Sequence, residues 1–544
     1  MTAPSQNLNG QNKSPSSSSS TSNSHSFSAA FIIVLWRHRL SLHGIRKPKG
    51  IRLIIIGPSD LLINEQEVDV IHNVDGPITA KDHNFAALLQ KTREQCSALE
   101  NVKRVICTFE RCLQRQIAQI REELGIEGLT VDQFDQLMHR QSVRAICKRG
   151  GLQTLKFCSF GSVQGKLDEW VSHANTQVCN YPMLLRPVCV EQNCLHTLAI
   201  ARNSNELKDW IKARPHSSNF ASETDYLVEE CLMDGFEFIS IASTRTGLIG
   251  TFCSIDSRKT LICSVLAQQS YSIEYLNSEM TRDVLPGVES FVMQTLKTVF
   301  VRSDIFPPLV FIKGFYRGHN SITFLSGSYE LGFYRGHNSI TFLSGSYELG
   351  KKSLTNLFTW ANEGKNWEVI SIQCVLDALM ENINCLLQEN KINGYNNLNE
   401  HQNGCYIQEN GYNNTKNNKK HFALINFPNN EGVLLHQSSI QLRAYSNSKI
   451  RLAWRVSEGE ELLDADGIDD NILQIFLNNP NRHELLRDIA DLCRRIEIPI
   501  DRNSMAGTER RLPICRRDLR AIAASSSSPF SSGHQLIRSC TTTD

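Results

Sequence analysis

The sequence lacks an excess of charge of either sign and a long apolar run. Its 57 Lys and Arg residues are balanced by 56 Asp and Glu residues, so no broad basic field is available to attract nucleic acid or an anionic membrane. The apolar run at residues 31–36 is far shorter than the roughly 20 residues of a transmembrane helix and is a candidate strand. We therefore expect no nucleic-acid partner and no membrane partner.

The sequence also lacks the closely spaced cysteines of a zinc or disulfide framework. Its 17 cysteines are scattered over 544 residues without a C-x-x-C pair. The closer pairs, Cys107 with Cys112 and Cys189 with Cys194, have no second pair of ligands nearby, so we interpret them as packing thiols. The Ser-rich head at residues 1–28 does not have the basic-then-apolar order of a signal peptide. Reduced thiols and a cytoplasmic location are predicted.

The length predicts three or four compact units. Residues 51–56 form an apolar run ending at Gly57, which indicates a buried strand. A helical pattern at 85–99 and a second strand at 104–108 follow, and this alternation is typical of a parallel α/β sheet. Apolar residues three or four apart predict a helix over 110–124 that stops at Gly125.

Further along, Thr130 and Gln133 predict a capped helix that continues to Lys148. Three segments have the apolar density of strands, at 181–187, 195–201 and 225–230. Residues 391–420 are rich in Asn and read as a flexible insertion. After it, strands at 421–427 and 449–456 and a helix at 482–496 predict a small α+β unit.

One block is repeated without a change, residues 315–332 recurring as 333–350. Two copies are too few for a solenoid, which needs about three stacking units. A recent tandem duplication and a gene-model error both explain the identity. A single sheet position cannot hold both copies, so we expect one copy to bulge outward.

Two segments carry a resemblance to a known family. The two segments are residues 121–130 (REELGIEGLT) and residues 226–238 (YLVEECLMDGFEF). Together with the order of the elements, they resemble the ATP-grasp superfamily, in particular its carboxylate–amine ligase branch, which includes carnosine-synthase-like proteins. The first is similar to the family's linker before the ATP-binding unit, and the second is similar to its adenine hinge. The implied fold is an N-terminal open α/β (pre-ATP-grasp) domain, an ATP-grasp fold and a small C-terminal α+β unit, within a multidomain α/β and α+β chain.

This resemblance predicts a pre-ATP-grasp domain at 29–138, followed by the N-terminal ATP-grasp subdomain at 139–225 and the C-terminal ATP-grasp subdomain at 226–390. The Asn-rich insertion at 391–420 and the C-terminal unit at 421–500 come next. A Ser-rich tail at 1–28 and a second tail at 501–544 flank these units.

The resemblance also implies which residues bind a nucleotide. Arg186 stands where the family places a Lys on the phosphates, and the guanidinium keeps the charge while changing its geometry. Glu229 and Glu230 fall at the adenine hinge, and Glu237 falls on the next strand, where a carboxylate takes the ribose hydroxyls. Without the family, Arg186 pairs equally well with a surface carboxylate, and the acids belong to a solvated strand, turn and strand.

Other motif positions depart from the family. His139 and Arg140 replace an Asp-Lys pair that opens a helix. The loop at 188–197 has no glycine, although small residues are what let backbone N–H groups approach phosphates.

The departures extend to the magnesium ligands. In the family a strand Glu and Asn hold Mg²⁺ and an Arg contacts the reacting groups, whereas Ser344, Ser346 and Glu348 stand at these positions, and the first repeat copy matches likewise. Lys313 stands where an earlier metal carboxylate is expected. Serine offers little to Mg²⁺, which prefers carboxylate oxygens, so we name no metal ligand and no catalytic residue.

Three functions remain open. The leading hypothesis is a pseudoenzyme, an ATP-binding scaffold whose ligase activity is impaired or absent. The second is an active ligase that joins a small carboxylate to an amine through an acyl phosphate, with metal ligands recruited from elsewhere, such as Glu330 or Glu348. The third is an interaction platform without a ligand. The sequence does not identify the substrate or the oligomeric state.

Overall fold

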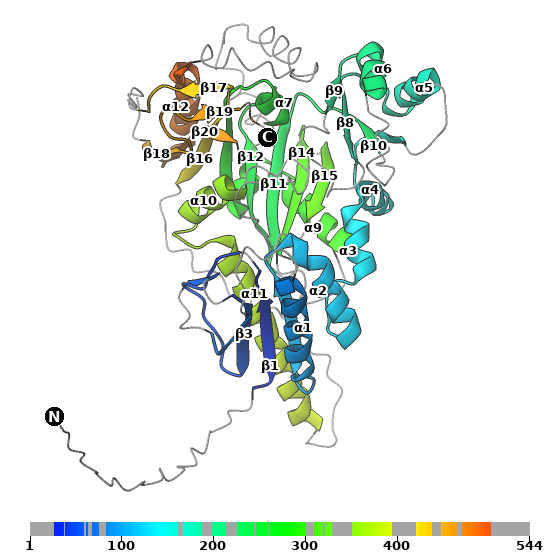
Figure 1. The fold of residues 1–544 in the computed structure, drawn as a ribbon, viewed down its shortest axis with the longest axis vertical. Helices are drawn as coiled ribbons and strands as arrows, with labels where there is room; N and C mark the ends of the chain where they lie inside the picture. The colour runs from blue at the N-terminus through cyan, green and yellow to red at the C-terminus, as the bar shows by residue number, and fades with distance from the viewer. Residues whose placement is uncertain are drawn as a thin grey trace, which may run out of the picture.

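The fold contains a parallel sheet, a small antiparallel sheet and a large antiparallel sheet (Figure 1). The computed structural model describes residues 27–36, 38–58, 61–63, 68–74, 83–160, 167–187, 199–213, 226–243, 246–258, 261–300, 309–318, 321–328, 351–393, 420–437, 448–463, 465 and 470–501. Within these ranges, the predicted multidomain α/β architecture is confirmed.

The parallel sheet is N-terminal and has the order β5-β3-β1-β6. Its strands are β1 (Ala29–Val34), β3 (Ile51–Gly57), β5 (Val70–Asn73) and β6 (Lys103–Thr108). One face packs under α1 (His83–Ser97) and α2 (Arg111–Leu124). The predicted strands and helices of this region are therefore confirmed, including the stop of α2 at Gly125, which has φ 60°. A short parallel pair, β2 (Leu40–Ser41) and β4 (Leu62–Ile63), lies beside the sheet.

The other face of the parallel sheet is covered by a helix from much later in the chain. This helix, α11 (Trp367–Asn393), runs down beside β1 and β3 in Figure 1. Its Ile372, Leu376 and Leu379 share an apolar cluster with Phe31 and Leu53. The N-terminal layer is therefore closed by the C-terminal half of the chain.

The connection out of the parallel sheet is two helices rather than one. The capping box at Thr130 and Gln133 is present and opens α3 (Val131–Met138). The chain then takes an extended conformation at His139, with φ −98° and ψ 109°, before α4 (Arg140–Arg149) begins. The prediction of one continuous helix is wrong at this residue, because the break has no Gly or Pro to mark it.

The small antiparallel sheet follows, with the order β7-β10-β8-β9. It consists of β7 (Phe157–Phe160), β8 (Met183–Pro187), β9 (Ala199–Ala201) and β10 (Tyr226–Glu230). One face is buried under α5 (Leu167–Val178) and α6 (Ser204–Ala213) through an apolar cluster that includes Val171, Leu185 and Val228. The opposite face contacts α4, through Arg144 of that helix.

The large sheet has eight strands, all antiparallel to their neighbours. In order they are β15 (Ile322–Ser328), β14 (Val310–Tyr316), β11 (Phe236–Ser243), β12 (Gly247–Ser254), β13 (Tyr271–Asn277), β16 (His421–Pro428), β20 (Asn471–Asn479) and β18 (Lys449–Trp454).

Helices cover both faces of the large sheet. One face packs on α8 (Ser278–Val284), α9 (Val288–Thr295) and the π-helical turn η5 (Leu296–Phe300), and the other packs on α7 (Leu261–Leu266) and α10 (Lys351–Ala361). The last helix, α12 (Arg482–Arg495), packs on β16 and β20. A third small sheet contains β17 (Gly432–Leu434), β19 (Glu461–Leu462) and β21 (Ile500–Asp501).

The strands expected after residue 420 are present in the C-terminal region. Strand β16 pairs with β13, so β16, β20 and β18 extend the large sheet. The first copy of the repeat supplies the end of β14 and all of β15, and the second copy lies outside the described residues. No helix in the described ranges combines the length and apolarity needed to cross a membrane.

Candidate functional site

The segment 231–235 links the small sheet to the large one, and both sides hold it in place. The Cys231 N–H donates to the Pro182 carbonyl at 3.1 Å. The Arg317 guanidinium donates to the Met233 carbonyl at 2.8 and 3.1 Å. At Gly235 a Cβ atom would lie 2.5 Å from the Phe315 ring. The close approach of this segment to β14 therefore requires glycine.

Apolar side chains from three parts of the chain meet beside this segment. Leu232 packs with Leu155 and Phe315, and the partly buried Leu325 of β15 joins them. Because Leu232 lies two residues after the end of β10, this cluster fixes the end of the small sheet on the β14–β15 hairpin. The hinge predicted from the sequence is thus an ordered junction between the two sheets.

Glu229, one of the acids expected at the hinge, is fully buried in an ion pair. Its Oε1 lies 2.5 Å from Nη2 of Arg144 on α4, and neither side chain is exposed by more than 2%. The Arg144 guanidinium also lies over the Phe157 ring, 4.8 Å from its centre. The sequence does not signal this pairing, since Arg144 and Glu229 are far apart in the chain and Arg144 lies in an otherwise ordinary amphipathic helix.

The other predicted binding acids also contact the protein. Glu230 accepts a hydrogen bond from the Lys156 N–H at 2.9 Å. Glu237 is buried, and its Oε2 accepts from the N–H of Leu261, the first residue of α7, at 3.1 Å. A carboxylate at this place stabilises the helix start. These contacts use one carboxylate oxygen of each residue to hold the hinge region together.

Arg186 lies on β8, where its backbone pairs with Leu227 of β10. It therefore belongs to the strand that neighbours the hinge strand β10. The loop at 188–197 that follows it lies outside the described residues.

Lys313 is a buried lysine on β14, two residues before Phe315. Its exposed fraction is 5%, and strand alternation puts it on the same face as Phe311 and Phe315. In the register it is opposite Ile239 of β11, and Glu237, two residues earlier, shares that face. Across the hairpin its partner is Ser326, which in the first copy of the repeat is the equivalent of Ser344. The two positions where the resemblance implies metal carboxylates are therefore paired neighbours.

The described residues do not fit a Mg²⁺ ion at this place. Mg²⁺ takes oxygen ligands in octahedral geometry, whereas the Lys313 ammonium has no lone pair to give. No group of three or more His, Cys, Asp or Glu side chains able to hold a metal occurs in the described part of the chain. Ser344, Ser346 and Glu348 lie outside that part.

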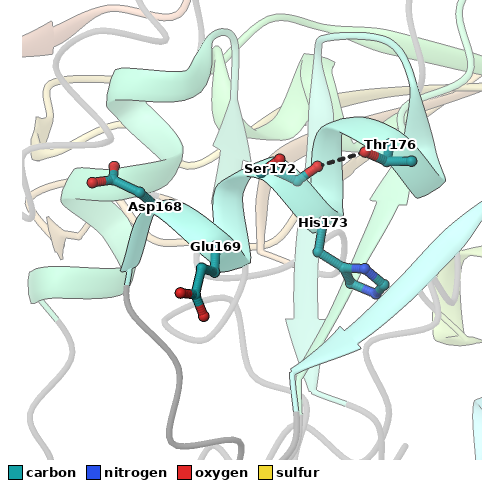
Figure 2. A pocket seen from close by; sticks show the side chains of 5 residues that line it. All are labelled: Asp168, Glu169, Ser172, His173 and Thr176. Atoms are coloured by element: carbon teal, nitrogen blue, oxygen red, sulfur yellow. Dashed lines mark hydrogen bonds between the residues drawn. The ribbon is translucent and has the colours of Figure 1, made fainter.

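A shallow hollow along α5 is lined by five side chains of that one helix (Figure 2). Thr176 donates its hydroxyl hydrogen to the Ser172 carbonyl within the helix, and Asp168 forms an ion pair with Lys208 of α6 at 2.6 Å. The lining residues are Asp168, Glu169, Ser172, His173 and Thr176. Since all belong to one exposed surface, the hollow does not gather groups for chemistry.

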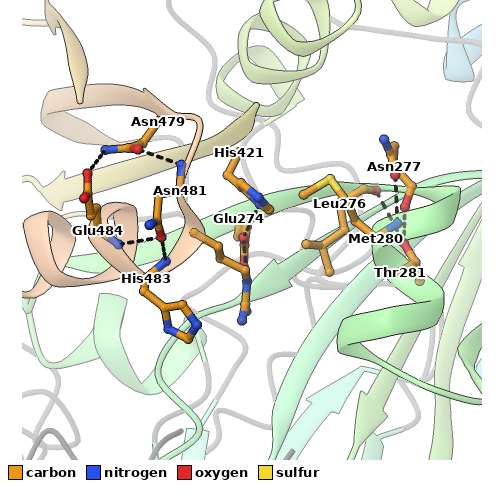
Figure 3. A network of polar contacts seen from close by, with 11 residues as sticks. Glu274, Leu276, Asn277, Met280, Thr281, His421, Asn479, Asn481, His483 and Glu484 are labelled. Carbon is orange, nitrogen blue, oxygen red and sulfur yellow. Dashed lines mark hydrogen bonds and ion pairs between the residues drawn. The ribbon is translucent and has the colours of Figure 1, made fainter. Parts of the chain in front are cut away.

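A polar network joins strands β13 and β16 of the large sheet to α12 (Figure 3). Glu274 of β13, exposed by 1%, accepts from Arg482 at 2.9 and 3.0 Å, and His421 lies 3.8 Å from it. Asn481 caps α12 by accepting from the N–H groups of His483 and Glu484. The network neutralises a buried carboxylate and anchors the helix, which is a structural role.

Solved structures similar to this chain are known at low sequence identity. No protein-family model matches the sequence, and no curated protein is similar to it in sequence. The L-amino acid ligase from Bacillus licheniformis has 10% identity and a TM-score of 0.46, with 87% of this chain and 98% of that chain covered. N5-carboxyaminoimidazole synthetase from Staphylococcus aureus, complexed with ADP, has 10% identity and a TM-score of 0.43, covering 86% and 97%.

A third similar structure is the biotin carboxylase domain of 2-oxoglutarate carboxylase from Hydrogenobacter thermophilus, in complex with MgADP. It has 13% identity and a TM-score of 0.42, covering 86% of this chain and 90% of that chain. The three are a ligase, a synthetase and a carboxylase, and they do not single out the carnosine-synthase-like branch. With TM-scores below 0.5, they carry no argument about what this chain binds.

Proposed function

We propose that this protein is an ATP-grasp scaffold that binds a nucleotide at the junction of its two antiparallel sheets and has impaired or absent ligase activity. Three features support nucleotide binding there. The segment after β10 is ordered between the sheets, the buried Leu232 and Phe315 hold it against β14, and Arg186 lies on the strand next to the hinge strand.

The observation that supports impaired catalysis is Lys313. A ligase of this class transfers a phosphoryl group to a carboxylate, and a divalent cation must neutralise the charge that develops on that group. Here a buried lysine stands at one implied metal position, and its register partner across the hairpin is a serine. A single ammonium cannot bridge phosphate oxygens as a cation with open coordination positions does.

A two-part experiment tests this function. Thermal-shift measurements with ATP, ADP and GTP are expected to raise the melting temperature dose-dependently, because a ligand that binds only the folded state stabilises it. Phosphate-release assays with ATP, Mg²⁺ and panels of small carboxylates and amines are expected to stay at the background rate. Turnover well above background that Arg186→Ala abolishes would identify an active ligase instead. No shift with any nucleotide would favour an interaction platform.

A further inference from the structure

Strand β18 is the last strand in the order of the large sheet, at the opposite edge from β15. Among the described strands it pairs only with β20, over its full six residues and without a register shift. The Arg455 N–H donates to the Ile472 carbonyl at 2.9 Å, and bonded residues alternate along an antiparallel pair. The odd-numbered residues of β18 therefore bond to β20. The backbone groups that point away from the sheet belong to Ile450, Leu452 and Trp454.

The two faces of β18 differ in character. Its even-numbered side chains are half-buried and pack on the apolar cluster beneath α12. Lys449 and Arg451 lie on the other face and are exposed. Neither forms an ion pair with a residue in the described part of the chain, and the β20 residues opposite them are Asn478 and Phe476. The edge therefore presents exposed positive charge on one face and apolar surface on the other.

Charged side chains on an edge strand also serve to prevent association with another sheet. β18 itself contains no proline, and its register with β20 has no bulge, so charge is the only such device within the strand. A second copy of this chain would bring its own Lys449 and Arg451 to the same edge, where like charges destabilise a strand pair. A strand with acidic side chains would instead be attracted by these two cations. The charge pattern thus disfavours self-association and favours an acidic partner.

We propose that β18 binds an extended acidic segment of another protein as an additional antiparallel strand of the large sheet. The outward N–H and C=O groups form the main-chain hydrogen bonds of such a strand addition, and the side chains set its specificity. Residues of the segment opposite Lys449 and Arg451 carry carboxylates, and those opposite the even-numbered residues of β18 are apolar. This inference does not depend on the proposed nucleotide binding.

A designed peptide tests this surface. The labelled peptide Val-Thr-Val-Glu-Val-Glu has the required pattern when it runs antiparallel to β18. Its fluorescence anisotropy with the full-length protein should give a Kd at least about tenfold lower than that of Val-Thr-Val-Lys-Val-Lys. Raising NaCl from about 0.05 M to about 0.5 M should weaken this binding at least about threefold, because salt screens exposed charges. Hydrogen exchange resolved to single residues should show that the bound peptide slows the amides of Ile450, Leu452 and Trp454.

Three variants sharpen the test. Arg451→Glu reverses one of the two charges and should weaken binding of the acidic peptide at least about fivefold, while strengthening binding of the lysine peptide. Arg149→Glu reverses an exposed charge on α4 and serves as the matched control, with no change expected. Leu452→Pro removes an outward N–H that makes no bond to β20, which an edge strand tolerates, and should weaken binding at least about tenfold.

Three results would overturn the proposal. Equal binding of the acidic and the lysine peptide, or no binding of either, would mean that Lys449 and Arg451 only keep β18 apart from other strands. Binding of the acidic peptide without slower exchange of the outward amides would mean that the peptide binds elsewhere. Unchanged affinity in Arg451→Glu would remove the charge recognition that defines the partner.

Discussion

The buried ion pair between Arg144 and Glu229 should hold the small sheet against α4, and a double-mutant cycle measures its contribution. In Arg144→Met the Glu229 carboxylate, with none of its side chain exposed, would lose its charged partner. Removing one member of such a pair costs about 3–5 kcal/mol. Loss of the guanidinium from the Phe157 ring adds about 0.5–2 kcal/mol.

The double variant Arg144→Met with Glu229→Leu should recover most of this loss, because apolar residues of similar size often replace a buried pair without a net cost. The chain has several units, so a single global unfolding free energy is not well defined. Hydrogen exchange of the backbone amides in β7 and β10 reports the local opening free energy instead. A loss of 3 kcal/mol there corresponds to exchange faster by about two orders of magnitude.

The control is Arg115→Met, which breaks an exposed pair with Asp135. Exposed pairs contribute about 0–1 kcal/mol, so the exchange of β7 and β10 should not change. The reasoning is refuted if Arg144→Met accelerates exchange in these strands less than threefold. It is also refuted if the losses in the two single variants simply add in the double variant, which would mean that the residues do not interact.

Three further changes give measurable outcomes. Gly314→Ala should lower the melting temperature and weaken any nucleotide binding, because the new Cβ would lie 2.3 Å from the Phe238 ring; Gly44→Ala, where the Cβ meets nothing within 4 Å, should leave that binding unchanged. Leu376→Ala on α11 should cost about 2–5 kcal/mol and accelerate hydrogen exchange in β1 and β3, whereas the exposed Asp377→Ala should not. Burial raises the pKa of the Cys107 thiol to about 12, so as the pH rises this thiol ionises in the unfolded chain before it ionises in the folded one. Above about pH 9 the thiol therefore lowers the free energy of unfolding by up to about 1.4 kcal/mol per pH unit. The denaturant midpoint of the transition that exposes Cys107, followed at pH 8 and pH 10.5, should fall less between the two pH values in Cys107→Val.

Local signals in the sequence predicted the N-terminal elements well. The spacing of Leu113, Ile117 and Ile120 predicted α2, and all three side chains are buried in one cluster. Gly125 and the Thr130 capping box predicted where α2 ends and α3 begins, and the structure has both. Signals of this kind depend on residues within one or two turns of each other, so they do not need the tertiary fold.

The candidate site could be predicted only in part, because its contacts join distant segments. The motif order assigned Glu229 and Glu230 to a hinge and Glu237 to the next strand. It could not show that Glu229 pairs with Arg144 or that Glu237 caps α7. The position of Lys313 was visible in the sequence, whereas its burial and its pairing with Ser326 follow from strand register, which only the folded sheet defines.

The packing of α11 joins the N-terminal parallel sheet to a segment that lies much later in the sequence. The parallel sheet within residues 29–138 has helices of its own on one face only, and α11 covers the other. Fully burying one aliphatic side chain stabilises by about 1.5–3 kcal/mol, so six of them contribute about as much as the entire stability of a small domain, about 5–15 kcal/mol. The six from α11 are Val369, Ile372, Val375, Leu376, Leu379 and Ile383.

Polar contacts reinforce the same junction. Nε2 of His38, in the loop after β1, lies 2.8 Å from a carboxylate oxygen of Glu368, and Arg46 exchanges backbone hydrogen bonds with the Gln373 side chain at 2.9 and 3.1 Å. Because Glu368 and Gln373 both lie in the first two turns of α11, the start of that helix is fixed on the parallel sheet. The preceding helix, α10, is fixed on the large sheet. The N-terminal sheet therefore completes its core only after the chain has passed through the candidate site, and the stability of the two regions should be coupled.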